Sequence, residues 1–351
     1  MFFPAEEKYV KIMGRTIRRD GLLYLGYSCS FIEFTFTGKR AEALLWSDSP
    51  TFPDIHKPWL AVFIDENTDP IRRFPLEKVE DRYVLYESDT SKETKLRLVK
   101  YSEAAFGKVG IKSLFIDGEI PPKPTASLSR RLEFIGDSIT CGYGNEGVWM
   151  TDVFQTAQEN PWEAYAAVTA RNLEADYQMV CWSGIGIISN WTDQDTPNEE
   201  WLMPALYPYT DKACDLALGR EPEYWDYNRY VPDCIVINLG TNDHSYTKGI
   251  SDRVAIFAAK YYEFLSQVRG CNPNSTILCT LGAMGQELGP AIRGQVDRMI
   301  AEGDERIHFL SYEVQKSKDG IGSDWHPSLL THQKMADKLE GKIREIMSWQ
   351  D

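Results

Sequence analysis

The sequence predicts an α/β protein of two domains. A β-sandwich of the jelly-roll type is expected over residues 1–125, and a three-layer domain with a doubly wound parallel sheet over residues 126–351. Short apolar segments separated by turn residues fill the first part of the chain, a proline-rich stretch follows, and the remainder alternates buried strands with amphipathic helices. With 351 residues, 43% of them apolar, the chain is long enough for two such domains.

The predicted N-terminal strands are short and rich in β-branched and aromatic residues. Turn residues such as glycine, aspartate, asparagine and proline separate them, and the run FIEFTF at 31–36 alternates with period two. Seven or more strands at this spacing are typical of a β-sandwich or jelly roll. The segments are LLYLGY (22–27), CSFIEFTFTG (29–38), ALLWSD (43–48), WLAVFIDE (59–66), RYVLYES (82–88), TKLRLVKYS (94–102) and KSLFIDG (112–118).

The stretch GEIPPKPTASLSRR, residues 118–131, predicts a linker. Pro121, Pro122 and Pro124 lack the N–H that a strand interior requires, so this stretch cannot join a sheet and favours a semi-rigid connection. We therefore place the domain boundary between residues 125 and 126.

Beyond the linker the pattern predicts a parallel sheet covered on both faces, with a ligand crevice at the carboxyl ends of its strands. Asn160 and Pro161 begin one helix in the manner of a cap and a first-turn proline, and Gly270 ends another. The predicted strands are 131–136, 177–182, 233–240, 275–282 and 306–311, and the predicted helices are 160–173, 254–270 and 328–347.

Composition excludes two classes of partner. The net charge is −14 and no lysine- or arginine-rich cluster occurs, whereas nucleic acids and anionic membranes both require concentrated positive charge. No segment reaches 18 apolar residues, and the N-terminus MFFPAEEKYVKIMGR lacks a signal-peptide pattern. We expect a cytoplasmic protein, although the sequence leaves open whether a leader was removed.

The seven cysteines predict reduced, mostly buried thiols. They are scattered and form no Cys-x-x-Cys pair or zinc-ligand cluster, so we expect no metal site. Cys141 lies three residues after Ser138 and is an alternative nucleophile, but nothing around it indicates a lowered thiol pKa.

Four segments carry the residues of an acyl-transfer site: GDSIT (136–140), WSGIG (182–186), NLGTND (238–243) and SDWHPS (323–328). A serine needs a base, and the oxyanion of the tetrahedral intermediate needs fixed donors. Ser138 offers the hydroxyl and a backbone N–H, Gly184 a second N–H and Asn242 an amide. His326 is the expected base. Each residue also has a structural alternative: Ser138 could be a helix cap, Gly184 a turn glycine, Asn242 a loop cap and His326 a surface histidine. A purely structural explanation of the four segments together would require four coincidences.

These segments resemble the four blocks of the GDSL or SGNH hydrolases, over the C-terminal two-thirds of the chain. Within that superfamily GDSITCGYG, SGIGI, WDYNRYVPDCIVINLGTND and DWHPS resemble carbohydrate esterase family 2, whose members join an N-terminal jelly roll to an SGNH-hydrolase domain. The resemblance implies Ser138 as nucleophile, His326 as general base, and Ser138, Gly184 and Asn242 as the oxyanion hole.

One position departs from the superfamily pattern, in which an aspartate stands three residues before the histidine. Ser323 occupies that place, and the nearest carboxylate is Asp324. We expect Asp324 to complete a catalytic triad; the alternative is a backbone carbonyl that orients His326. Asp137 and Asp243 are expected to accept N–H groups of their loops. His244, beside Asn242, is disfavoured as a base because a base approaches from the side opposite the oxyanion donors.

Ten tryptophans suggest a platform on which sugar rings stack, and Trp182 and Trp325, adjacent to the site residues, are the candidates for substrate contact. The resemblance implies a serine esterase that removes O-acetyl groups from xylan, glucomannan or their oligosaccharides through an acetyl-enzyme, without metal or cofactor. A lipase or lysophospholipase with the same site, or a catalytically inert carbohydrate-binding protein, are the alternatives. The polysaccharide, the acetylated hydroxyl and the number of chains, including a homo-oligomer, stay open.

Overall fold

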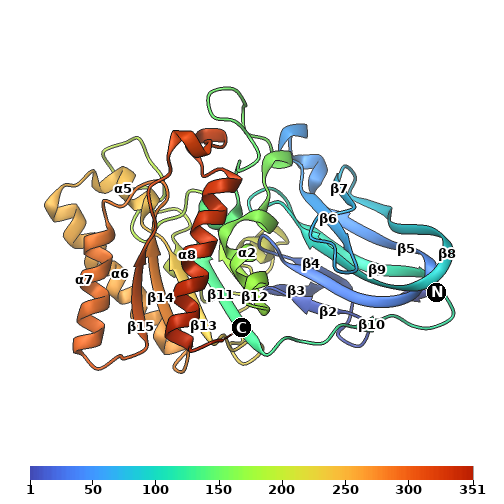
Figure 1. The fold of residues 1–351 in the computed structure, drawn as a ribbon. Coiled ribbons are helices and arrows are strands. Elements are labelled where there is room, and N and C mark those ends of the chain that lie inside the picture. Colours follow the sequence, from blue (N-terminus) through green and yellow to red (C-terminus); the bar gives the residue numbers. More distant parts are fainter. Residues whose placement is uncertain (351) are drawn as a thin grey trace.

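The computed structural model describes residues 1–350 and contains two β-sheets. A ten-stranded sheet built from β1 to β10 forms the N-terminal part of the molecule, on the right in Figure 1, and a five-stranded sheet with its helices forms the remainder. The proline-rich stretch was expected to stay outside a sheet, but its Lys123 and Pro124 form β10 and pair with Thr35 and Phe34, because proline is tolerated in a short edge strand. The chain passes from the first sheet to the second between residues 124 and 130. This architecture confirms the predicted fold class, while the boundary at 125/126 stays a prediction.

The N-terminal sheet is antiparallel and strongly curled (Figure 1), in the order β3-β4-β9-β5-β8-β6-β7, with β1 beside β9 and both β2 and β10 beside β5. Its core contains alternate residues of β5, among them Ile32, Phe34 and Phe36. The strands are β1 (Phe2–Phe3), β2 (Lys11–Met13), β3 (Thr16–Arg19), β4 (Leu22–Leu25), β5 (Phe31–Ser47), β6 (Trp59–Ile64), β7 (Arg72–Pro75), β8 (Glu80–Lys100), β9 (Val109–Asp117) and β10 (Lys123–Pro124).

Two pairs of predicted strands are each one long strand. Segments 29–38 and 43–48 merge into β5, and segments 82–88 and 94–102 merge into β8. Arg40, Ala41 and Glu42 stay in the ladder of β5, where Arg40 forms an ion pair of 2.8 Å with Glu87 across the sheet. In β8 the mostly exposed residues 88–91 bulge out of the ladder, because Gly38 pairs with Lys92 and Arg40 pairs with Glu87. Register shifts near Gly38 and Ala41 bend the strands without breaking them.

The C-terminal sheet is parallel, with the strand order β12-β11-β13-β14-β15. It is doubly wound, and the order reverses between β11 and β13, where such sheets bind ligands. The strands are β11 (Arg130–Gly136), β12 (Ala175–Cys181), β13 (Cys234–Asn238), β14 (Thr276–Leu281) and β15 (Ile307–Ser311).

Helices cover both faces of this sheet (Figure 1). Residues of α2 and α8 pack with Leu132 and Phe134 of β11, whereas residues of α6 and α7 pack with Ile135 on the opposite face. Helix α7 is an addition to the predicted elements. The helices are α1 (Ser138–Cys141), α2 (Tyr165–Asn172), α3 (Met203–Leu206), α4 (Lys212–Ala217), α5 (Thr241–Thr247), α6 (Ser251–Cys271), α7 (Gly289–Ala301) and α8 (Leu329–Met347).

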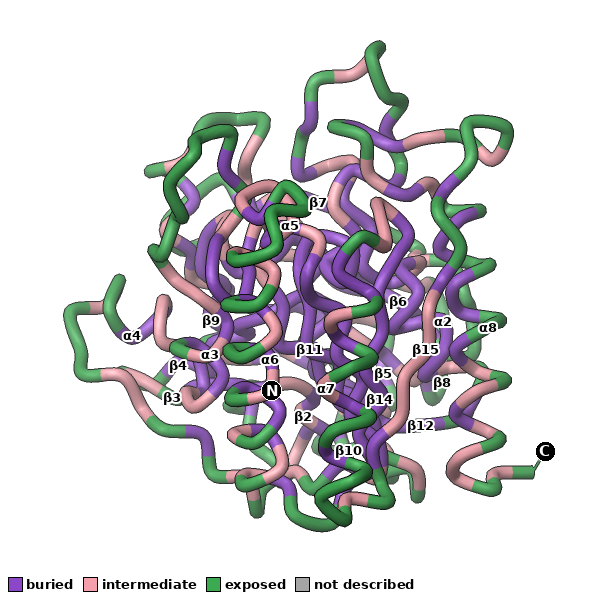
Figure 2. The backbone as a smooth tube through the Cα atoms, turned by 90° about the vertical axis from the view of Figure 1, so that its left-hand side faces the viewer, coloured by how far each residue is buried: buried purple, intermediate pink, exposed green. Residues whose placement is uncertain are grey.

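The two parts of the chain share a buried interface. One apolar cluster contains Phe31 and Phe63 of the N-terminal sheet together with Phe134 and Tyr165 of the C-terminal domain. Arg15 is fully buried there, and its guanidinium donates to Glu133 at 3.0 Å and to the carbonyl oxygens of Tyr207 and Tyr209. Figure 2 shows the buried backbone running through the middle of the molecule, with exposed helical turns outside. Within residues 1–350, no helix has the length and apolar character needed to cross a bilayer.

Candidate active site

Three of the predicted site residues follow the carboxyl ends of neighbouring strands. Gly136, the last residue of β11, pairs with Cys181 of β12 on one side and with Asn238 of β13 on the other. Ser138, Gly184 and Asn242 therefore leave the sheet at one edge, at the point where the strand order reverses.

Ser138 begins the short helix α1 directly after β11. Asp137 is the N-cap of this helix, because its carboxylate accepts the Ile139 N–H at 3.0 Å. The capping role that was the structural alternative for Ser138 thus belongs to its neighbour, and the serine hydroxyl is free for another contact. Gly136 allows the turn, since a Cβ there would lie 2.0 Å from Thr140 Oγ1.

The Ser138 hydroxyl contacts the imidazole of His326. Its Nε2 lies 2.8 Å from Ser138 Oγ, and its Nδ1 lies 3.1 Å from the main-chain oxygens of both Ser323 and Asp324. A carbonyl oxygen can only accept, so Nδ1 carries the proton and Nε2 presents its lone pair to the serine hydroxyl. Loss of solvation lowers the pKa of His326 to about 4, against the opposing effect of the two carbonyl contacts and of Asp324. The imidazole is therefore neutral at pH 7, as a general base must be.

The expectation that the Asp324 carboxylate orients His326 does not match this geometry. That carboxylate accepts a hydrogen bond from Tyr143 Oη at 3.0 Å, and no contact between it and His326 Nδ1 occurs within residues 1–350. Asp324 and Trp325 have φ angles of 51° and 66°, a left-handed turn that aims the carboxylate outward and brings main-chain oxygens under the imidazole. The arrangement is a serine–histidine dyad, the alternative that the sequence left open.

Ser138 itself and the loop that contains Gly184 offer hydrogen-bond donors. The backbone N–H groups of Ser138 and Gly184 have no acceptor within residues 1–350, so both are available to a ligand oxygen. Gly184 has a φ of 78°, which favours glycine, and a Cβ there would meet nothing within 4 Å. Asn242 Nδ2 donates to Ile185 O at 2.9 Å and lies 3.4 Å from Asp137 Oδ2, which places its amide beside the same loop. The free N–H groups support the predicted oxyanion-hole roles of Ser138 and Gly184. The role of Asn242, whose amide donates to Ile185 O and Asp137 Oδ2, stays a prediction.

Two buried aspartates hold the loops behind these donors. Asp243 accepts N–H groups from Ile187, Ile188 and Ser189 at 2.7 to 3.2 Å. Burial raises the pKa of Asp243 to about 6 and that of Asp137 to about 7; for Asp137, the charge of Asp243 adds to the effect. Both make the loop contacts expected of them. No contact joins the rival base His244 to Ser138 within the described residues.

Aromatic side chains lie next to His326 in the chain and around Gly184. Trp325 is 39% exposed and contacts Trp149 edge to face at 4.3 Å. Trp182 stacks with Trp201, and both line a cavity of about 250 Å³ that also includes Gly184 and the exposed Trp191. The sequence candidates Trp182 and Trp325 thus lie where a substrate could be contacted, and that role stays a prediction.

Tyr143 is a site residue that sequence reasoning missed. Its ring centroid is 4.5 Å from that of His326, and it stacks on Phe154 at 3.6 Å. Its place inside the run GDSITCGYG was the only available signal. The hydroxyl of Tyr143 is bonded to Asp324, and its ring packs against the His326 imidazole.

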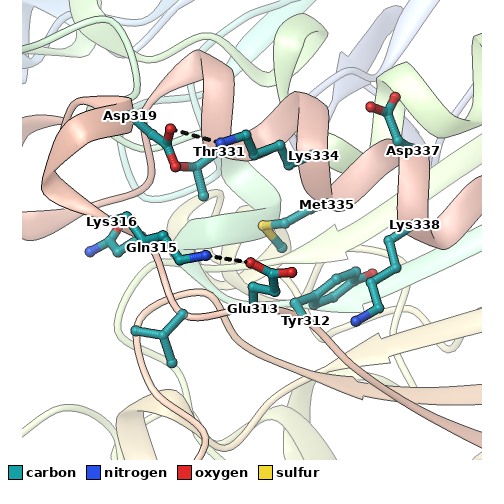
Figure 3. Close-up of a pocket in the computed structure, with 11 residues that line it drawn as sticks. Tyr312, Glu313, Gln315, Lys316, Asp319, Thr331, Lys334, Met335, Asp337 and Lys338 are labelled. Carbon is teal, nitrogen blue, oxygen red and sulfur yellow. Dashed lines mark hydrogen bonds and ion pairs between the residues drawn. The ribbon is translucent and has the colours of Figure 1, made fainter.

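A larger cavity, of about 490 Å³, lies behind the histidine loop, between α8 and residues 312–319 (Figure 3). Its rim carries the ion pairs Lys316–Glu313 and Lys334–Asp319, each 2.7 Å long. Gln315, from its wall, donates to Trp325 O at 2.7 Å. The cavity contains neither Ser138 nor His326, and its clearest connection to the dyad is this support of the turn.

A serine hydroxyl bonded to a neutral histidine, with unused N–H donors beside it at the edge of a doubly wound sheet, defines a serine hydrolase. Residues 134–334, more than half of the chain, match the GDSL-like lipase/acylhydrolase family, and residues 12–124 match the carbohydrate esterase 2 N-terminal domain. The chain belongs to the GDSL-like lipase/acylhydrolase family.

Similar proteins are carbohydrate esterases. The chain is 34% identical over 331 residues to the cellulase/esterase CelE of Acetivibrio thermocellus, a match that covers 92% of the chain and 38% of that protein. It is 30% identical over 349 residues to an acetylxylan esterase/glucomannan deacetylase of Cellvibrio japonicus, covering 98% of the chain and 91% of that protein. A family two carbohydrate esterase from Clostridium thermocellum, solved in complex with cellohexaose, superposes with a TM-score of 0.85 at 31% identity, covering 97% of this chain and 100% of that one.

Proposed function

We propose that this protein is a serine esterase that removes O-acetyl groups from plant-wall polysaccharides or their oligosaccharides, with acetylated xylan and glucomannan as the substrate class. The observation that carries the proposal is the 2.8 Å contact between Ser138 Oγ and a His326 whose Nδ1 proton is held by carbonyl oxygens. The names of the similar proteins supply the substrate class.

In the first half-reaction His326 Nε2 takes the hydroxyl proton as Ser138 Oγ attacks the acetyl carbonyl carbon. The negative charge that develops on the carbonyl oxygen is met by the N–H groups of Ser138 and Gly184 and by the Asn242 amide. The C–O bond to the sugar breaks, and His326 returns the proton to the departing sugar oxygen. An acetyl ester on Ser138 remains.

In the second half-reaction the same groups act on water. His326 Nε2 takes a proton from water as its oxygen attacks the acetyl carbon, and the same donors meet the oxyanion. Ser138 Oγ then leaves with the proton from His326, and acetate is released. Two exposed aromatic side chains, Trp325 next to His326 in the chain and Trp191 in the cavity that contains Gly184, are suited to hold the sugar rings during both steps.

Release of acetate from a panel of acetylated xylo- and manno-oligosaccharides tests the proposal, with 4-nitrophenyl acetate as a general ester and Ser138→Ala as the inactive control. Turnover of one or more of the acetylated saccharides, absent in the control, is the expected result. Hydrolysis of 4-nitrophenyl acetate or long-chain esters alone would overturn the substrate class. The cytoplasmic location and the number of chains in the assembly stay predictions for fractionation and sedimentation to test.

A further inference from the structure

A carboxylate of the N-terminal domain reaches the active-site loops. Glu103 lies in the connection between β8 and β9, and its side chain is fully buried against the C-terminal domain. Its Oε2 accepts the backbone N–H of Ser183 at 2.7 Å. Ser183 is the residue immediately before Gly184, whose own N–H is the free donor beside Ser138.

The same carboxylate oxygen contacts the helix that carries the nucleophile. Cys141 Sγ lies 3.7 Å from Glu103 Oε2, and Cys141 is the last residue of α1, which Ser138 begins. A single oxygen atom from the accessory domain therefore contacts both elements that supply backbone donors to the oxyanion.

Glu103 is itself held from both domains. Glu159, in the C-terminal domain, accepts the backbone N–H of Glu103 at 3.1 Å, and Lys100 Nζ donates to the Glu103 carbonyl at 2.9 Å. One oxygen of each glutamate, Glu103 Oε1 and Glu159 Oε2, has no partner within the described residues. Burial raises the pKa of both carboxyl groups, that of Glu159 well above its usual range.

The cluster of Glu103, Cys141 and Glu159 is close enough for shared metal coordination, with its polar atoms within 4.8 Å of one another. Two features argue against a metal ion bound by this cluster. The ammonium of Lys100 is bonded to the same segment, and burial raises the pKa of the Cys141 thiol well above its usual range, so the sulfur is not a thiolate.

We propose that Glu103 is a positioning residue for the oxyanion hole, supplied in cis by the N-terminal domain, and that turnover requires this domain to be docked. By fixing Ser183 against α1, the carboxylate sets the separation between the backbone donors of Gly184 and Ser138. The inference rests on the proposed function, because a positioned oxyanion hole has a consequence only where an ester is cleaved.

Kinetics of Glu103→Ala and Glu103→Gln test the proposal in the full chain, with 4-nitrophenyl acetate and an acetylated xylo-oligosaccharide as substrates. Glu103→Ala removes the acceptor of Ser183 N–H, and the expected result is a fall in kcat of up to about 100-fold, the scale of a misplacement of roughly 1 Å, with KM little changed. The amide oxygen introduced by Glu103→Gln still accepts that N–H, so this variant should recover most of the turnover.

Arg19→Gln is the matched control. Arg19 also crosses between the domains, donating to Asp215 at 3.2 Å and to Glu223 at 2.9 Å, but neither partner belongs to the active-site loops. This variant should lower the melting temperature and leave kcat at the wild-type value. Melting temperatures of all variants establish that each is folded at the assay temperature.

Three kinetic results would overturn the inference: a wild-type kcat in folded Glu103→Ala, a Glu103→Gln that is as slow as Glu103→Ala, or an equal loss of kcat in Arg19→Gln. Stoichiometric zinc in the purified protein, whose removal by a chelator abolishes turnover, would also overturn it in favour of a metal centre. A wild-type protein that cleaves 4-nitrophenyl acetate but no acetylated saccharide would contradict the proposed substrate and leave this test in force.

Discussion

The candidate active site has a nucleophile side, around Ser138 and Gly184, and a base side, around His326. Different kinds of contact hold the two sides. Behind Ser138 and Gly184, the buried carboxylates of Asp137, Asp243 and Glu103 accept backbone N–H groups of the loops. Behind His326, by contrast, the acceptors are two main-chain oxygens in a left-handed turn, and the nearby Asp324 carboxylate is exposed and bonded elsewhere.

The difference determines how each side responds to substitution. A carboxylate that is buried and bonded leaves unsatisfied N–H groups when it is removed, so a change on the nucleophile side displaces the donors it supports. A main-chain acceptor survives any side-chain replacement that preserves the turn. We therefore expect the nucleophile side to be sensitive to substitutions in its supporting side chains, and the base side to tolerate them.

The largest effect is expected where the two sides meet. Ser138→Ala and His326→Ala should each reduce turnover by about 10⁶-fold, because the loss of one member of a catalytic unit costs about as much as the loss of the whole unit. The fold should persist, since Asp137 and not Ser138 caps α1. Acetate release measures the loss and thermal unfolding verifies the fold. Turnover near the wild-type value in either folded variant would refute the dyad.

On the nucleophile side, Asn242→Ala should reduce kcat by roughly 100- to 1000-fold, the scale of one lost oxyanion donor, with little change in KM. Asn228→Ala is the matched control and should retain wild-type kinetics, because within residues 1–350 its side chain bonds only to Asp226, in an exposed turn. Steady-state kinetics on one acetylated oligosaccharide, which give kcat and KM separately, distinguish an oxyanion donor from a substrate-binding residue. A raised KM at constant kcat would make Asn242 a binding residue instead.

The pH dependence of kcat/KM sharpens the description of the base side. With a pKa of about 4, His326 is neutral and competent at neutrality, so kcat/KM should stay level down to about pH 5 and fall by about tenfold per unit below pH 4. An inflection near 6.5, the ordinary histidine value, would contradict the desolvated imidazole.

The same lowered pKa affects stability with a defined sign. The neutral His326 imidazole contributes to the free energy of unfolding. This contribution is fully present above the unfolded-state pKa of 6.5 and is lost as the pH falls toward the folded-state pKa of about 4. Circular dichroism at each pH therefore accompanies the rates and separates protonation of the base from acid unfolding.

The smallest effect is expected for Asp324→Asn. Asparagine tolerates the left-handed conformation of this residue, and the carbonyls that hold His326 Nδ1 survive the change, so kcat should fall by a few-fold at most. Tyr143→Phe, which removes the hydroxyl bonded to this carboxylate, should be similarly mild. A loss approaching the roughly 10⁴-fold seen when a triad aspartate is replaced would restore Asp324 as a third catalytic residue.

The sequence was informative where chemistry follows regular structure. Ser138, Gly184 and Asn242 come directly after apolar strands, and parallel strands end at one edge, so their proximity was predictable. The strand breaks near Gly38 and within 80–100 were predicted wrongly, because polar and mostly exposed residues at a β-bulge, here 88–91, resemble turn residues in a one-dimensional pattern.

The sequence by itself determined the two-domain order, the doubly wound sheet and which residues meet at the candidate site, because periodicity, turn residues and motif spacing are local properties. Only the tertiary structure decided what orients His326 and what supports the oxyanion loop. The first depends on two φ angles that aim the Asp324 carboxylate away from the imidazole. The second depends on Glu103, a residue of the other domain whose contact with Ser183 spans 80 positions along the chain and exists only because burial of the shared apolar interface brings the two domains together.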